Sequence, residues 1–100
     1  MTSRFDAALC AMREGRMLIL VDDADRENEG DLVVAAQFVT EAHVAFMARQ
    51  ARGLVCLALS HELCDHLALE PMTAVNTAPL GTAFTFSIDA RDGVQAGISA

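Results

Sequence analysis

Six carboxylates lie within ten consecutive residues, from Asp22 to Asp31, directly after the apolar residues 17–21. Two unit charges about 6 Å apart repel each other by roughly 0.7 kcal/mol in water and by about 3 kcal/mol at an effective dielectric constant of about 20. A folded and partly sheltered loop of this composition needs a cation, because Arg26 alone cannot balance six anions. Carboxylate oxygens suit Mg²⁺ or Ca²⁺ better than Zn²⁺, so the run predicts a site for a hard divalent cation.

Two other interpretations of this run exist. A solvated acidic turn is the first, since most runs of charge are wet surface. An EF-hand is the second, because Asp25, Glu27 and Glu29 match positions 1, 3 and 5 of its calcium loop. Position 12 of that pattern needs a bidentate Glu and here holds Ala36, and the segment before the loop is strand-like rather than helical. These departures argue against an EF-hand.

The acidity of the chain is local. The net charge is −7 over 100 residues, and residues 22–31 contribute six acids and one Arg, a balance of −5. No basic cluster is present to bind a phosphate backbone, so nucleic acid is not an expected partner. The glycines match neither the Walker nor the dinucleotide spacing, which argues against a nucleotide site of either type.

Cysteine usage and hydropathy favour a reducing, cytoplasmic location. Three cysteines form an odd set without metal-ligand spacing, so neither a disulfide framework nor a zinc site is predicted. The longest apolar stretch, residues 54–59, is far shorter than the 18 or so residues that span a bilayer, and no membrane partner is expected. Asp6 and Glu14 interrupt the amino-terminal region, which argues against a secretory signal.

Apolar residues at helical spacing, preceded by polar caps, predict three helices. Ser3 with Asp6 three residues later has the pattern of a capping box. The predicted helices are residues 4–14 after Ser3, residues 41–51 after Thr40 with Gly53 as the stop, and residues 61–68 after Ser60.

Uniformly apolar runs that are too short for surface helices predict buried strands at residues 17–21, 32–36 and 54–59. Residues 82–88 alternate, which predicts a half-buried strand with Phe84, Phe86 and Ile88 on its inner face. The Thr- and Ala-rich residues 73–81 are expected to form a loop. We therefore expect residues 1–100 to form a single α+β domain, a mixed sheet with flanking helices.

Outside the acidic run, the other residues with possible chemistry carry weaker signals. The histidines fall on predicted helices, and surface or packing roles are the expected ones; they are His43, His61 and His66. Cys56 is open to two interpretations. Burial in the middle of a strand is one, and contact with an anionic ligand beside Arg52 is the other.

Four blocks of sequence occur in a recognisable order: residues 13–17 leading into 20–32, residues 52–59, residues 76–77 with 81–85, and residues 87–90 with 97–100. The first contains Asp25-Arg26-Glu27-Asn28-Glu29-Gly30-Asp31. In this order the blocks closely resemble the 3,4-dihydroxy-2-butanone 4-phosphate synthases of riboflavin biosynthesis. The resemblance spans almost the whole chain.

The resemblance implies a lyase that converts D-ribulose 5-phosphate to 3,4-dihydroxy-2-butanone 4-phosphate and formate, with Mg²⁺ or Mn²⁺ holding the oxygens of the substrate. It also implies a cytoplasmic protein that works as a homodimer and has a small sugar phosphate as its partner. A chelated cation acidifies protons beside a carbonyl and stabilises enediolate-like charge. Carboxylates at a strand end suit that chemistry.

By the same resemblance, Glu27 is a metal ligand that also binds substrate, and Arg26 contacts the substrate. Asp31 is expected to bind substrate hydroxyls or to assist proton transfer as a catalytic group. The remaining expected site residues are Cys56 and Thr85, which line the pocket, and the supporting acids Asp22, Asp23, Asp25 and Glu29.

The chain also departs from the family pattern. Ala24 stands where the family usually has an acid, and Gln95-Ala96 replaces a Thr-Thr pair. The family's glycine-histidine-threonine segment, which supplies a second metal ligand, and a later catalytic Glu do not occur within residues 1–100. We therefore expect an amino-terminal part of the family domain, truncated and inactive by itself. A non-catalytic remnant that binds metal or a partner chain is the alternative.

Overall fold

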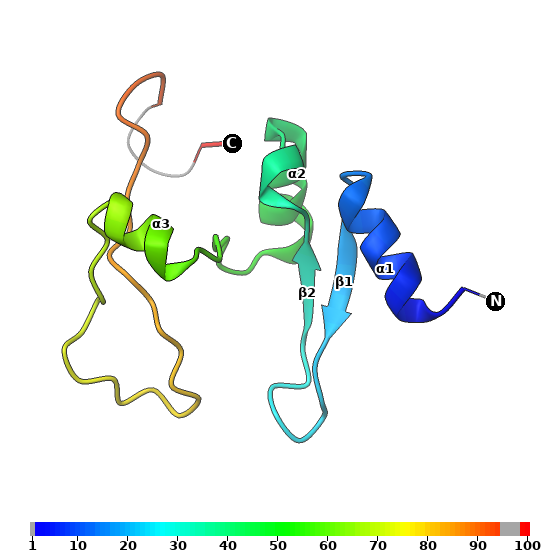
Figure 1. Cartoon of the computed structure of the whole chain (residues 1–100), viewed down its shortest axis with the longest axis horizontal. Coiled ribbons are helices and arrows are strands. Elements are labelled where there is room, and N and C mark those ends of the chain that lie inside the picture. Colours follow the sequence, from blue (N-terminus) through cyan, green and yellow to red (C-terminus); the bar gives the residue numbers. More distant parts are fainter. Residues whose placement is uncertain (1, 95–98) are drawn as a thin grey trace. The chain divides into compact units, whose positions relative to one another are not determined.

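The structure is a computed structural model that describes residues 2–94, 99 and 100. It is α+β, as expected, and divides into two compact units, Met1–Leu57 with Ala100 and Ala58–Ser99. The first unit holds the helix α1 (Arg4–Arg13), the strands β1 (Leu18–Val21) and β2 (Gly30–Val33), the 3₁₀ turn η1 (Ala36–Phe38), the helix α2 (Glu41–Phe46) and the π-helical turn η2 (Met47–Ala51) (Figure 1). The second unit holds the helix α3 (His61–His66). None of the described helices has the length and apolar character needed to cross a membrane.

The amino-terminal end of α1 is fixed by its own side chains. The backbone N–H of Asp6 donates to Ser3 Oγ at 3.1 Å, and the backbone N–H of Ser3 donates to the Asp6 carboxylate at 3.2 Å. The Ser3 hydroxyl also donates to Asp6 at 2.7 Å, and these bonds hold the pKa of Asp6 below its usual value. The predicted capping box is confirmed.

The strands β1 and β2 form an antiparallel hairpin whose register runs from Leu18 opposite Val33 to Val21 opposite Gly30. The first strand forms as predicted, although it begins at Leu18 rather than at residue 17. The second was predicted over residues 32–36 but begins earlier and ends at Val33, because the ladder continues directly from the loop and the chain then turns into η1. Among the described residues the sheet holds these two antiparallel strands rather than a mixed set.

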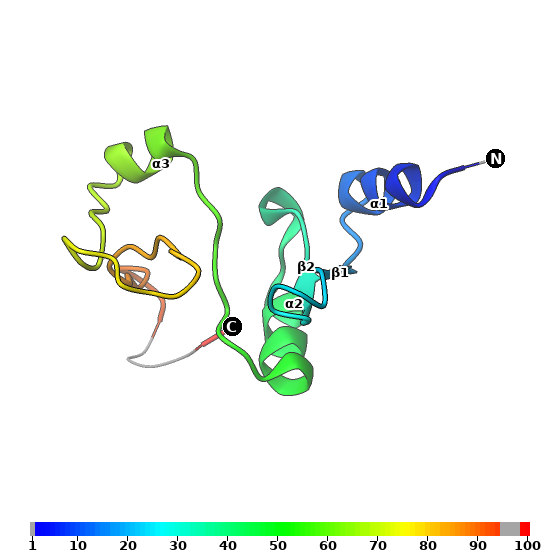
Figure 2. The same cartoon turned by 90° about the horizontal axis from the view of Figure 1, so that it is seen from below.

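The second predicted helix forms in two parts. The Thr40 hydroxyl accepts the backbone N–H of His43 at 3.2 Å, which confirms the predicted cap. The helix α2 then runs into η2 (Figure 2). The π turn closes with a bond from the Arg52 N–H to the Met47 carbonyl at 3.2 Å, so Arg52, with a φ of 61°, ends the helix where Gly53 was predicted as the stop.

The prediction of a buried strand over residues 54–59 is wrong. The segment forms no ladder with any other part of the described chain. A strand needs a neighbour for its backbone N–H and C=O groups, and without one this run stays irregular, with Leu54 79% exposed. The strand β1 does form, but the burial predicted for it is absent, since Val21 is 72% exposed.

In the second unit, Ser60 caps α3 through the backbone N–H of Leu63 at 3.2 Å, as predicted, although the last two residues of the predicted helix form a turn. Residues 73–81 form the expected loop. The predicted strand over residues 82–88 is reduced to one bridge between Pro71 and Thr85. Thr85 is half-buried and the three residues of the predicted inner face are exposed, because so short a pairing does not impose a pleat on the segment.

Gly15, in the connection between α1 and β1, packs closely against Phe38 of η1. Its φ is +74°, and a Cβ added there would lie 3.0 Å from the Phe38 Cβ. Gly81 offers a matched comparison, because its φ is +65° and a Cβ there would meet nothing within 4 Å. A positive φ costs an alanine about 1–2 kcal/mol at either position, so only Gly15 adds a steric conflict.

We expect Gly15→Ala to displace the Phe38 side chain and Gly81→Ala to leave it unchanged. Side-chain NMR signals of Phe38 in the two variants measure the difference. Phe38 signals that match the wild type in the Gly15 variant would contradict this packing.

Candidate functional site

The connection between β1 and β2, residues 22–29, carries five carboxylates, and we call it the acidic loop (Figure 1). The sixth carboxylate, Asp31, lies in β2 opposite Leu20, one residue beyond the Val21–Gly30 pair that closes the hairpin. The antiparallel pairing therefore gathers all six carboxylates at one end of the hairpin, as the sequence predicted for a strand end.

Asp22 is the carboxylate on which the loop is built. One of its oxygens accepts the backbone N–H of Glu29 at 2.9 Å, and the other accepts the backbone N–H of Glu27 at 3.0 Å. Arg26 Nη1 donates to this second oxygen at 3.0 Å. These partners hold the pKa of Asp22 below its usual value. The two backbone N–H groups lower it more than the guanidinium does.

The backbone of the loop is closed by its own hydrogen bonds. The Asp23 carbonyl accepts the N–H groups of Arg26 at 3.0 Å and Asn28 at 3.2 Å, and the Asp22 N–H donates to the Glu29 carbonyl at 3.3 Å. Asn28 has a φ of 52°, a left-handed conformation that Asn tolerates better than most residues. The turn thus forms from local contacts of the acidic run itself.

Arg26 lies between two carboxylates. Its Nη1 contacts Asp22 at 3.0 Å, and its Nη2 lies 3.3 Å from Glu27 Oε1. The guanidinium is 56% exposed, and surface ion pairs of this kind contribute about 0–1 kcal/mol. Arg26 can therefore exchange one of these partners for another anion at little cost.

The carboxylates of the acidic loop are the candidate ligands for a metal ion. Among the residues that the structure describes, no three His, Cys, Asp or Glu side chains come together as a metal cluster. Both oxygens of Asp22 accept hydrogen bonds, whereas the Glu27 carboxylate contacts the exposed guanidinium of Arg26. Mg²⁺ keeps several waters and is held through one or two carboxylates. The chemistry of Glu27 thus fits a hydrated Mg²⁺ but not a cage of protein ligands.

The side chains of the other predicted site residues take no part in the hydrogen bonds and ion pairs of Asp22, Arg26 and Glu27. Asp23, Asp25 and Glu29 are exposed members of the loop. Cys56 is exposed in the first unit, with its thiol 3.7 Å from the Leu54 carbonyl, so the interpretation as a buried strand residue is wrong. Thr85 belongs to the second unit, where its hydroxyl donates to the Phe86 carbonyl at 3.0 Å. Gln95 and Ala96 lie outside the described residues.

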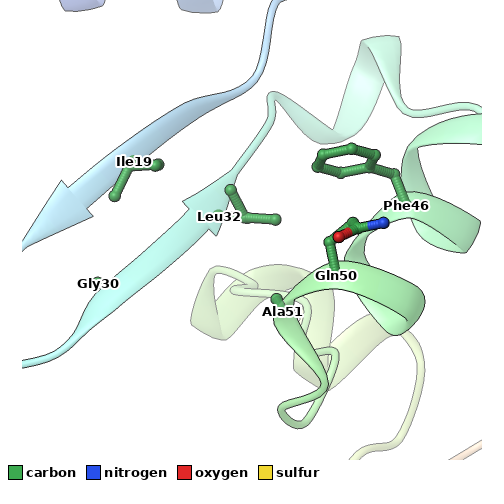
Figure 3. Close-up of a pocket in the computed structure, with 6 residues that line it drawn as sticks. All are labelled: Ile19, Gly30, Leu32, Phe46, Gln50 and Ala51. Carbon is green, nitrogen blue, oxygen red and sulfur yellow. The ribbon is translucent and has the colours of Figure 1, made fainter.

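An open pocket of about 370 Å³ lies between the hairpin and the helical segment that follows it (Figure 3). Gln50 is the one polar side chain in its lining and no charged group is present, so the pocket does not complete the acidic site. Phe46 and Gln50 belong to no motif in the sequence, although their spacing of four residues places them on one helix face. The lining residues are Ile19, Gly30, Leu32, Phe46, Gln50 and Ala51.

The sequence profile of the 3,4-dihydroxy-2-butanone 4-phosphate synthase family matches residues 6–100. The chain is 54% identical over 97 residues to the riboflavin biosynthesis protein RibBA of Aquifex aeolicus, covering 95% of this chain and 24% of that protein. It is 50% identical over 97 residues to a 3,4-dihydroxy-2-butanone 4-phosphate synthase of Cupriavidus pinatubonensis, covering 97% of this chain and 44% of the relative.

A solved structure gives the same result for the fold. RibBX of A. baumannii, a two-domain 3,4-dihydroxy-2-butanone 4-phosphate synthase, superposes with a TM-score of 0.84 at 52% identity, over 97% of this chain and 28% of that one. The chain therefore spans less than half the length of each of these three proteins. The match over residues 6–100 nevertheless includes the whole acidic loop, and the chain belongs to the 3,4-dihydroxy-2-butanone 4-phosphate synthase family.

Proposed function

We propose that this chain provides the acidic loop of a synthase that converts D-ribulose 5-phosphate to 3,4-dihydroxy-2-butanone 4-phosphate and formate in riboflavin biosynthesis. The observation that carries the proposal is the family match over residues 6–100, which contains the loop without interruption. The location of six carboxylates at one end of a hairpin supports it, because the reaction moves protons beside a carbonyl and needs hard oxygen ligands.

Glu27 is the proposed ligand of Mg²⁺ or Mn²⁺. A divalent cation held there would acidify protons beside a bound carbonyl and stabilise enediolate-like charge. Glu27 suits the role because its backbone N–H is bonded to Asp22, while its carboxylate is engaged only by an exposed guanidinium. The carboxylate can therefore release Arg26 without disturbing the turn.

Arg26 and Asp31 are the proposed substrate-binding groups. A guanidinium has five N–H donors, and the contacts to Asp22 and Glu27 leave others to donate to an oxygen of the sugar phosphate. Asp31 is exposed on β2 at the same end of the hairpin, where its carboxylate can accept a substrate hydroxyl or take up a proton. The ladder of β2 fixes its backbone.

We expect Mg²⁺ to bind this chain weakly at Glu27, because the described residues bring no three possible ligand side chains together around it. Amide NMR during a Mg²⁺ titration should show shifts around residues 25–31, and Glu27→Gln should remove them. A spectrum that does not change at millimolar Mg²⁺ would contradict the proposed site.

We expect the 100-residue chain by itself to release no formate from D-ribulose 5-phosphate with Mg²⁺ present. Precise positioning of reacting groups lowers a barrier by roughly 7–11 kcal/mol, and one exposed loop cannot supply it. A formate assay on the purified chain measures this. Magnesium-dependent formate release that is lost in Glu27→Gln would show that these residues suffice as a minimal synthase.

A further inference from the structure

We propose that Asp22 is a positioning residue of the acidic loop, which holds Glu27 and Arg26 in place through hydrogen bonds and is not itself a ligand of cation or substrate. This inference rests on the proposed function of Glu27. It separates Asp22 from Asp23, Asp25 and Glu29, which the sequence alone groups with it as supporting acids.

The bonds of Asp22 occupy most of its accepting capacity. A carboxylate offers about four lone-pair sites, and three are used here, by the N–H of Glu29 at 2.9 Å, the N–H of Glu27 at 3.0 Å and Arg26 Nη1 at 3.0 Å. One accepting site on the oxygen bonded to Glu29 remains, so a cation that used more than this site would have to displace Arg26 or a backbone N–H that closes the turn. Its side chain is 25% exposed, so Asp22 is half-buried, whereas residues 23–29 of the loop are exposed.

The two backbone bonds hold Glu27 itself and Glu29, two residues further on. They tie the backbone at positions 27 and 29 to the side chain of Asp22, which directly follows β1. The far end of the loop is therefore held against its beginning. Arg26 is held by the same carboxylate and reaches Glu27 from there. Removing the acceptor would leave the loop closed only by its backbone bonds to Asp23 and Glu29.

The adjacent acids give a matched pair of variants, Asp22→Asn and Asp23→Asn, which make the same change in charge and size. An asparagine at position 22 has one accepting oxygen and two N–H donors, so it cannot accept both backbone N–H groups through separate oxygens. Asp23 is exposed, and its backbone carbonyl, which the substitution retains, makes its contacts within the loop.

Amide hydrogen exchange of Glu27 and Glu29 tests the proposal in the intact chain. We expect exchange at both amides to be faster by at least about tenfold in Asp22→Asn and unchanged in Asp23→Asn. Protected β1–β2 amides in both variants establish that the hairpin remains folded. Arg26→Gln, which keeps both acceptors, should retain the protection. Equal exchange in Asp22→Asn and the wild type, or equal acceleration in the two Asn variants, would overturn the proposal.

Mn²⁺ affinity, measured from paramagnetic broadening at Glu27, gives the readout that a merely structural role would not move. We expect Asp22→Asn to lower it several-fold more than Asp23→Asn, although both remove one charge. Equal losses would overturn the positioning role. Binding that survives Glu27→Gln would instead refute the proposed function of Glu27, and the exchange experiment, which needs no cation, would still decide the role of Asp22.

Discussion

The hydrogen bonding of one carboxylate to its own loop is the interaction on which the site depends. Five acids in the short connection between β1 and β2 repel one another, and the turn needs groups that offset this charge. Asp22 supplies the anchor by accepting two backbone N–H groups, and Arg26 places its positive charge between Asp22 and Glu27. Hydrogen bonds to an ionised acceptor are about twice as strong as neutral ones, so negative charge itself helps to close the turn.

The apolar part of the first unit positions this loop without taking part in its chemistry. The antiparallel register sets Gly30 opposite Val21, and a Cβ at Gly30 would lie 3.3 Å from Ile19 Cγ2. Glycine thus lets the two strands pack closely at the Val21–Gly30 pair, next to the acidic loop. The adjoining pocket is lined by apolar side chains and Gln50 and carries no charge that could hold a phosphate (Figure 3). The acidic loop, and not the pocket, is the chemically distinctive surface of this unit.

Local signals in the sequence predicted the helix caps correctly, whereas signals that depend on distant partners predicted strands that do not form. Ser3, Thr40 and Ser60 cap helices through residues three positions away, so a short window of sequence contains both partners. Residues 54–59 and 82–88 have the composition of strands, but a strand exists only where another segment pairs with it. The sequence likewise located the acidic site but could not separate Asp22 from Asp23, because only the folded turn determines which carboxylate faces the backbone N–H groups.

The acidic loop of this chain is proposed to serve the chemistry of its family. A chimera provides the most direct test, in which residues 6–100 replace the matching segment of a curated 3,4-dihydroxy-2-butanone 4-phosphate synthase. Formate release from D-ribulose 5-phosphate, with Mg²⁺ present, is the measurement. If the loop serves this chemistry, turnover by the chimera should be comparable to that of the parent synthase. A folded chimera that binds the sugar phosphate and releases no formate would contradict it.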